Sequence, residues 1–377
     1  MEIAWFTDTW LPNRDGVVTS LLAFKKVLER KGHIIYIFAP GEKNEERENL
    51  FLYKAKTFKP YPQYKFPSIL SIFSPRTKRI IRKIQPDVIH SHTPGIMGIH
   101  AILASHAIDM PLFFTFHTFI DDSVYLLFKS GKLQNITKKF IYRWLRWYCG
   151  NCSCIIAPSN YAAKRLTGIC KKDVKILPTG IELERFEKAD GKKIRERWQG
   201  KKIILHVGRI VKEKNIEILI EAASYILSKI DAIFVITGDG PYKTTLQKMV
   251  KKKGLEEHFV FTGFVSDEEL SSYYKAADVF AFPSTYETQG IVAFEAMAAG
   301  VPVVAARAKA LPDFIKDGEN GFLASPYDAK EFAEKIITAI ENKEIARKAR
   351  DFVKEYSIEK MADRLVKIYE GEMQNMD

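Results

Sequence analysis

The sequence predicts two doubly wound α/β domains, and three observations support this fold class. Short apolar, β-rich runs alternate with helical patterns along all 377 residues, which is typical of βαβ units. That length exceeds what one ordinary core accommodates. Between two sets of strand candidates, Pro178 and Gly180 interrupt both the strand-like and the helical periodicity within ILPTGIELERF, residues 176–186. We therefore expect one domain over 1–178 and a second over 179–357, with a final helix over about 358–377 returning to the first.

Each half of the chain supplies at least five strand candidates. In the first half they are Ile3–Thr7, Ile34–Ala39, Val88–Ser91, Leu112–Phe116 and Cys154–Ala157. In the second they are Ile203–Val207, Ala232–Thr237, Phe259–Thr262, Val279–Phe282 and Val303–Ala305. Doubly wound sheets bind ligands beyond the carboxyl ends of their strands. We therefore expect the chemistry in loops that follow strands, facing a cleft between the two domains.

Composition and charge narrow the class of protein. The chain is 46% hydrophobic and 28% charged, and no apolar run approaches the roughly 18 residues of a membrane span. Its start, MEIAWFTDTW, has an acid where a signal peptide has basic charge, so we expect a cytoplasmic location. The net charge of +12 is uneven, because residues 1–178 carry 27 basic against 13 acidic side chains and residues 179–377 carry 31 against 33. The positive first half favours an anionic partner.

The four cysteines are Cys149, Cys152, Cys154 and Cys170. CGNCSC has the first half of a zinc-knuckle spacing, but no second CxxC or HxxxH follows it. Cys154 also begins a strand candidate. The pattern favours buried thiols in a reducing compartment over a zinc site.

Two loops carry features suited to phosphate. In HVGRIVKEKN, residues 206–215, Arg209 and Lys214 lie five residues apart just after a strand, where they could clamp a diphosphate. In DTWLPNRDGVVTS, residues 8–20, Gly16 precedes a helical pattern and could let an anion approach the helix N-terminus. A solvated basic turn and a plain loop glycine are the alternatives, and GxGxxG is absent.

The segment STYETQGIVAFEAMAAG, residues 284–300, holds two glutamates eight positions apart. Glu287 lies in a predicted strand-to-helix loop, and Glu295 lies about one turn into the helix. The N–H groups of residues 290–292 lie between them at the helix start. A capping role could explain Glu287. Glu295 has no comfortable structural explanation from sequence, because a carboxylate among apolar residues needs a partner.

His117 follows a strand in FFTFHTFIDD, residues 113–122. A lone histidine is usually structural, but its position at a cleft-facing strand end favours a functional role.

Together these motifs resemble the retaining glycosyltransferases of family 4, which have the GT-B fold. The resemblance rests on Glu287 and Glu295 in an E-x7-E pattern, GRIVKEKN, ITGDGP, FTGFVSDEEL, PTGIELERF and EAMAAGVPVVA, and it covers nearly the whole chain. It implies a nucleotide-sugar donor held mainly by the second domain. N-terminal segments such as IHSHTPGIMGIHA look most like the branch of diacylglycerol glucosyltransferases.

The resemblance also implies a role for each site residue. Arg209 and Lys214 would bind the donor diphosphate, and Glu295 the ribose hydroxyls. Glu287 would contact hydroxyls of the donor sugar, and Gly290, Ile291 and Val292 would offer backbone N–H groups to sugar or phosphate. Phe264 and Val265 would lie at the base, Gly16 would approach the phosphates, and His117 would lie near the reacting carbon. No cofactor or metal is expected, and no D-x-D follows a strand.

The acceptor is less well defined by sequence. Between Lys132 and Tyr148, Ile136, Phe140, Trp144 and Trp147 recur at helical spacing, with Lys139, Arg143 and Arg146 on another face. Such a helix could lie on an anionic membrane or could bury its aromatic stripe in the core.

Three functions follow from these patterns. The favoured one is a lipid glycosyltransferase, peripheral at the inner face of the cell membrane. A transferase acting on a soluble sugar or sugar phosphate is the alternative, and a non-catalytic binding protein ranks last. No nucleic-acid motif accompanies the basic charge, so no nucleic-acid partner is expected.

Overall fold

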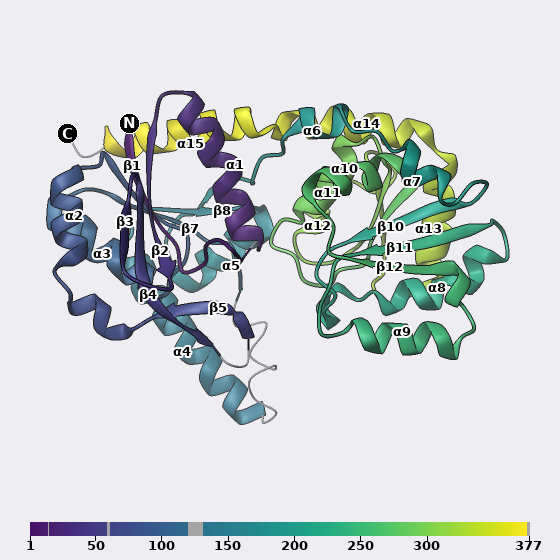
Figure 1. Ribbon diagram of the computed structural model, residues 1–377, viewed down its shortest axis with the longest axis horizontal. Helices are drawn as coiled ribbons and strands as arrows, with labels where there is room; N and C mark the ends of the chain where they lie inside the picture. Colours follow the sequence, from purple (N-terminus) through teal and green to yellow (C-terminus); the bar gives the residue numbers. More distant parts are fainter. Residues whose placement is uncertain (14, 59–60, 120–130, 375–377) are drawn as a thin grey trace. The chain divides into compact units, whose positions relative to one another are not determined.

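The computed structural model describes residues 1–377 except 14, 59–60, 120–130 and 375–377. It divides into two compact units (Figure 1). Unit 1 comprises Met1–Gly180 and Ile358–Asp377, and unit 2 comprises Ile181–Ser357. The expected joint at residues 176–186 contains the boundary, which lies two residues beyond the expected split. The final helix belongs to unit 1.

The sheet of unit 1 has the order β3-β4-β2-β1-β6-β7-β8-β9, with β5 paired to β4. Neighbouring strands are parallel except that β3 and β5 run antiparallel to β4. The strands are β1 Glu2–Phe6, β2 Ile34–Gly41, β3 Glu45–Arg47, β4 Leu50–Phe58, β5 Tyr61–Pro67, β6 Val88–Ser91, β7 Leu112–Thr115, β8 Cys154–Ala157 and β9 Lys175–Ile176.

The sheet of unit 2 is parallel throughout, with the order β12-β11-β10-β13-β14-β15. Its strands are β10 Lys202–Val207, β11 Ala232–Thr237, β12 Phe259–Gly263, β13 Val279–Phe282, β14 Val303–Ala306 and β15 Phe322–Ala324. Most of these strands are buried, consistent with helices covering both faces of a parallel sheet.

Helices connect most of the strands. In unit 1 they are α1 Gly16–Arg30, η1 Ile69–Phe73, α2 Arg76–Ile84, α3 Ile96–Ile108, α4 Gly131–Gly150, α5 Asn160–Cys170 and α15 Ile358–Met373. In unit 2 they are α6 Leu183–Glu187, α7 Lys192–Glu196, η3 Lys212–Lys214, α8 Glu217–Leu227, α9 Lys243–Lys252, η4 Glu256–His258, α10 Asp267–Ala276, α11 Ile291–Ala298, α12 Leu311–Phe314, α13 Ala329–Glu341, α14 Lys343–Val353 and η5 Lys354–Tyr356. Helix α1 packs beside α15, α2 on α3, α4 on α5, and α8 on α13 (Figure 1).

The ten strands predicted from sequence are all present, with small differences at their ends. Five further strands were not predicted: β3, β4, β5, β9 and β15. Three of them have two or three residues, too few to show a periodicity. β4 begins with a short apolar run at residues 50–53, which the prediction overlooked, and β5 lies almost entirely in the basic-aromatic stretch KAKTFKPYPQYKF, which lacks the apolar run of a buried strand.

Each sheet reverses its winding between two central strands. The pairs are β1 and β6 in unit 1, and β10 and β13 in unit 2. The loops that follow such a pair diverge and leave a crevice at the carboxyl edge of the sheet, where doubly wound folds bind ligands. The loop of Arg209 and Lys214 follows β10, and the loop of Glu287 follows β13.

Candidate active site

The loops that follow β10 and β13 are fastened to each other in unit 2. The carbonyl oxygen of Glu213 accepts hydrogen bonds from the backbone N–H of Thr285 at 3.0 Å and from its hydroxyl at 3.1 Å. Asn215 donates its side-chain amide to the carbonyl of Pro326 at 2.8 Å, which adds the loop after β15. The backbone of this edge is therefore held in place before any ligand arrives.

Lys214 and Glu287 form an ion pair across these two loops. Both side chains are mostly buried, so the pair is shielded from solvent. The two residues were expected to serve different parts of the donor, and the structure brings them into direct contact. A phosphate that binds Lys214 would share its ammonium with Glu287.

Arg209 is exposed, and its side chain makes no ion pair with the residues that the structure describes. Its loop packs on the GDGP loop after β11, because the N–H of Ile210 donates to the carbonyl of Asp239 at 2.9 Å. A Cβ at Gly238 would lie 2.0 Å from the carbonyl oxygen of Gly208, so only glycine allows this close approach. The guanidinium is thus carried by a fixed backbone and is open to a ligand.

Helix α11 begins directly after the Glu287 loop. Gly290 caps it with φ +90°, and a Cβ there would lie 2.8 Å from Leu311 and 3.0 Å from Phe282, so glycine is required. No side chain among the described residues caps this terminus, and its first turn holds no acid. The N–H groups of Ile291 and Val292 lack intrahelical acceptors and can bind an anion.

Glu295 is buried within α11, and the hydroxyl of Tyr274 donates to its Oε2 at 2.8 Å. Burial raises the pKa of Glu295, and the positive charge of Arg185 opposes that shift. The expectation that Glu295 has no structural explanation is therefore wrong, because α10 supplies a hydrogen-bond partner. Its ribose-binding role remains a prediction.

Phe264 and Val265 occupy the loop between β12 and α10. Phe264 is 77% exposed, whereas Val265 packs partly against the core of unit 2. The exposed ring offers a face to a planar group, and contact with a base remains a prediction.

His206 is a residue of this edge that the sequence patterns did not single out. It is buried near the end of β10, where its Nδ1–H donates to the carbonyl of Ala281 on β13 at 3.0 Å. Burial lowers its pKa to about 4, so it is neutral near pH 7. Its Nε2 is buried and has no partner among the described residues. The only sequence cue was its place two residues before the Gly208 turn.

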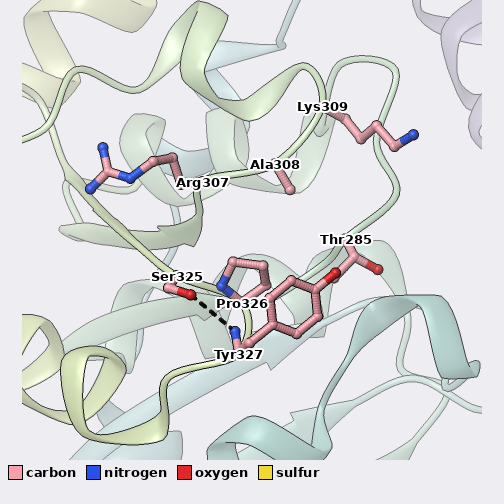
Figure 2. Close-up of a pocket in the computed structure, with 7 residues that line it drawn as sticks. All are labelled: Thr285, Arg307, Ala308, Lys309, Ser325, Pro326 and Tyr327. Carbon is pink, nitrogen blue, oxygen red and sulfur yellow. Dashed lines mark hydrogen bonds between the residues drawn. The ribbon is translucent and has the colours of Figure 1, made fainter.

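A hollow of about 360 Å³ lies beside the loops that follow β13, β14 and β15 (Figure 2). Its lining residues are Thr285, Arg307, Ala308, Lys309, Ser325, Pro326 and Tyr327. In Figure 2 the side chains of Arg307 and Lys309 point away from each other. The guanidinium of Arg307 lies 3.8 Å from Asp317 and 3.9 Å from Glu331. No residue predicted from sequence for the site lines this hollow.

Gly16 begins α1 in unit 1, and the side chain of Asp15 already caps that helix. Asp15 Oδ1 accepts from the N–H groups of Val17 and Val18, both at 3.0 Å. A phosphate approaching Gly16 would meet this carboxylate, which disfavours the expected contact. The role of Gly16 remains a prediction.

A second carboxylate, Asp8, caps α3 and was not singled out from sequence. It accepts from the Thr93 hydroxyl at 2.5 Å, from the Gly95 N–H at 3.1 Å and from the Met97 N–H at 2.9 Å. Burial raises its pKa, and these hydrogen bonds oppose the shift. Both helix starts next to the central strands of unit 1 are thus occupied by the protein's own carboxylates.

His117 lies after β7, and its Nε2 is 3.3 Å from Nδ1 of His92, which follows β6. Burial lowers the pKa of His117 to about 4. His117 is therefore neutral near pH 7 and contacts another neutral histidine.

Helix α4 exposes most of the aromatic stripe predicted over 132–148. Ile136, Phe140 and Trp147 are 64%, 67% and 48% exposed. Trp144 is only partly buried, and its indole N–H donates to the carbonyl of Pro94 at 2.8 Å. Lys139 and Arg143 are exposed on the same helix. Burial of the whole stripe in the core is therefore wrong.

The four cysteines are free and buried. Within the described ranges, no cluster of three or more His, Cys, Asp or Glu side chains could hold a metal ion. Among the helices of those ranges, none combines the length and the apolar character needed to cross a bilayer.

Comparisons with known proteins agree with this architecture. Residues 14–185 match the family described as Glycosyltransferase Family 4, and residues 188–371 match Glycosyl transferases group 1. The Anabaena HepE structure in complex with UDP has a TM-score of 0.78 at 20% identity, covering 98% of this chain and 100% of its own. Sucrose-phosphate synthase from Thermosynechococcus elongatus has a TM-score of 0.77 at 21% identity, covering 98% of each chain. These two likenesses concern the fold.

Curated relatives are more similar in sequence. The alpha-monoglucosyldiacylglycerol synthase of Streptococcus pneumoniae is 30% identical over 350 residues, covering 90% of this chain and 78% of the relative. The enzyme of the same name from Acholeplasma laidlawii is 30% identical over 368 residues, covering 92% and 89%. A GDP-mannose-dependent alpha-mannosyltransferase of Corynebacterium glutamicum is 28% identical over 383 residues, covering 98% and 88%.

Proposed function

The chain belongs to glycosyltransferase family 4 and has the GT-B fold, and on this basis we propose that it moves a hexose from a nucleotide-sugar donor to the hydroxyl of a diacylglycerol-type lipid. The proposal includes retention of configuration and independence of metal. The observation that carries it is the β10/β13 edge, where two cations, a carboxylate and an open helix N-terminus lie in loops fastened together.

In this proposal the donor diphosphate lies against Arg209, Lys214 and the N–H groups at the start of α11. Arginine, ammonium and backbone N–H groups all favour phosphate oxygens. Glu287 accepts hydrogen bonds from sugar hydroxyls, and Glu295 serves the ribose. Phe264 and Val265 lie at the base, and His117 serves the sugar. The phosphates could reach Gly16 only at a position next to the Asp15 carboxylate.

The proposed reaction breaks the bond from the anomeric carbon to the phosphate oxygen and forms a bond from the acceptor oxygen on the same face. The acceptor proton passes to the leaving phosphate oxygen. Positive charge develops on the sugar and negative charge on the diphosphate, so cations and N–H dipoles fixed at the phosphates stabilise the transition state. Pairing with Lys214 makes Glu287 a poorer nucleophile, which favours same-face attack over a covalent intermediate.

Two observations support a lipid acceptor: the names of two relatives and the exposed face of α4. Ile136, Phe140 and Trp147 would enter the lipid interface, and Lys139 and Arg143 would approach anionic head groups, each cation contributing about 1 kcal/mol near the surface. The enzyme would then work at a membrane surface.

Flotation with phosphatidylglycerol vesicles at low salt tests this membrane contact. Wild-type protein should float with the vesicles, and Ile136→Ser with Phe140→Ser should reduce the floating fraction severalfold. Tyr225→Ser, at an exposed aromatic residue of unit 2, is the matched control. If the wild-type chain ignores the vesicles, the membrane proposal fails.

The test of the whole function is transfer from a panel of labelled nucleotide sugars to diacylglycerol in mixed vesicles. A UDP-hexose should yield a labelled glycolipid whose anomeric configuration matches the donor, and EDTA should leave the rate unchanged. The mannosyltransferase relative makes GDP-mannose the second donor to include. Transfer only to soluble sugars would overturn the lipid acceptor, and a sugar adduct trapped on Glu287 would overturn same-face attack.

A further inference from the structure

Three histidines of unit 1 form a continuous series at the carboxyl ends of β6 and β7. The ring centroids of His90 and His92 are 4.1 Å apart, and those of His92 and His117 are 5.6 Å apart. The ring planes differ by 33° and 31°. The series ends at His117, the member with a predicted role at the donor sugar.

The first ring is held on both sides. Nδ1 of His90 lies 2.6 Å from the hydroxyl of Tyr369 on α15, and Nε2 lies 2.8 Å from the hydroxyl of Thr115. Because the indole N–H of Trp5 donates to the Tyr369 oxygen at 3.3 Å, the Tyr369 proton is left to donate to His90. His90 therefore accepts at Nδ1 and donates from Nε2.

His92 packs on this fixed ring and makes a T-shaped contact with Trp5 at a centroid distance of 5.1 Å. Its Nε2 is buried and has no partner among the described residues. An orphaned N–H in the interior is rarer than an orphaned acceptor. The single proton of neutral His92 therefore belongs on Nδ1, where it can be donated to Nε2 of His117 at 3.3 Å.

This bond determines the tautomer of His117. When Nε2 of a neutral imidazole accepts a hydrogen bond, its proton must be on Nδ1. In that tautomer the proton of His117 is on Nδ1 and its Nε2 lone pair is engaged by His92. The opposite tautomer would offer a lone pair at Nδ1 and would break the bond to His92.

We propose that His92 is a positioning residue, which fixes the ring plane and the Nδ1–H tautomer of His117, the residue expected to serve the donor sugar. The proposal deepens the function proposed above and rests on it for the sugar contact. The tautomer itself depends only on the geometry of unit 1.

Two variants separate hydrogen bonding from packing. His92→Asn can place an amide N–H near the position of Nδ1 and should retain the bond to His117. His92→Phe keeps a ring of similar area but has no donor. His100→Gln is a control for loss of a buried histidine of the same unit, because His100 bonds to Ser71 and Thr77 outside this series.

The direct measurement is nitrogen-15 NMR of the histidine rings in the full-length protein. In wild-type protein and in His92→Asn, His117 should be protonated on Nδ1, whereas His92→Phe should show a substantial Nε2–H population. In transfer assays, His92→Phe should lower kcat about ten- to a hundredfold with a small change in donor KM. His92→Asn should stay within about threefold of wild type, and His100→Gln should have wild-type activity.

An Nε2–H tautomer of His117 in the wild-type spectrum would overturn the proposal, even if the His92→Phe variant does not fold. An unchanged tautomer and kcat in a folded His92→Phe variant would also overturn it. If His117→Ala retains full activity while the Nδ1–H tautomer is observed, the sugar contact in the proposed function fails and the tautomer assignment stands.

Discussion

The two units share one strand order around their central strands, yet the carboxyl edges of their sheets differ in charge and in how the helix starts are capped. In unit 1 the helix starts next to the central strands are capped by Asp15 and Asp8, and neutral histidines follow β6 and β7. In unit 2 the edge carries Arg209 and Lys214, and α11 begins without a side-chain cap among the described residues. The same strand order thus leads to helix N-termini that are capped by the protein's own carboxylates in unit 1, and to a helix N-terminus without such a cap in unit 2. This difference favours unit 2 as the diphosphate-binding unit.

The largest effect should come from acid, through the buried histidines. Burial lowers the pKa values of His90 to about 3, of His100 and His117 to about 4, and of His92 well below the usual value, all in unit 1. In unit 2 the corresponding residue is His206. Between pH 6.5 and about 4 the unfolded chain binds protons that the folded chain does not, so stability falls as pH falls through this window. Between pH 6.5 and 4 each such group can remove at most about 3.4 kcal/mol, since one pKa unit corresponds to about 1.36 kcal/mol.

Asp8 and Glu295 have raised pKa values, so they bind protons more readily in the folded chain and oppose this loss of stability. Because Asp8 lies in unit 1 and Glu295 in unit 2, this opposing effect does not distinguish the two units. Unit 1 should therefore open first in acid. Limited digestion with pepsin near pH 4.5 should produce its first cuts within residues 1–180. Initial cuts between 181 and 357 would show that the histidines do not control acid stability.

The next effect concerns the two cations of unit 2. Lys214→Ala and Arg209→Ala should each remove a charge-assisted contact of about 1.5–3 kcal/mol, which weakens UDP binding about 10- to 150-fold by calorimetry. Lys212→Ala, at a neighbouring exposed lysine, is the matched control and should bind normally. If both variants bind UDP as tightly as the wild-type protein does, Arg209 and Lys214 do not bind the diphosphate.

Removal of the Asp8 cap should affect stability and leave donor affinity intact. Asp8→Ala leaves the N–H groups of Gly95 and Met97 and the Thr93 hydroxyl without their acceptor, at a cost of about 2–3 kcal/mol. Urea unfolding should show the loss, and calorimetry should show UDP affinity within about twofold of wild type. A large gain or loss in UDP affinity would mean that the α3 terminus takes part in donor binding.

The smallest effect separates the two roles of Glu295. Tyr274→Phe removes the hydroxyl that donates to Glu295 at 2.8 Å and lies 3.2 Å from the Val292 carbonyl, and it should lower the free energy of unfolding by about 1 kcal/mol. Glu295→Gln should weaken UDP about tenfold and leave binding of 2′,3′-dideoxy-UDP unchanged, if the carboxylate serves the ribose. Equal weakening of both nucleotides would assign Glu295 to the packing of α11 alone.

Sequence patterns predicted the central strands because buried parallel strands are continuous apolar runs, which are legible in a single chain. They also predicted that the site lies in loops that follow strands, and this assignment remains a prediction. The missed contacts join distant segments: Lys214 to Glu287 across 73 positions, Asp8 to Met97 across 89 and Glu295 to Tyr274 across 21. Such pairs depend on strand order and register, which no local pattern encodes.

Hydrogen–deuterium exchange of the full-length protein, with and without saturating UDP, most directly tests whether unit 2 holds the diphosphate. Protection should concentrate in residues 208–215 and 285–295, where the loops after β10 and β13 and the start of α11 lie. Residues 8–20, around the Asp15-capped start of α1, should change less. Protection centred on residues 8–20, with 208–215 unchanged, would contradict the assignment of the diphosphate to unit 2.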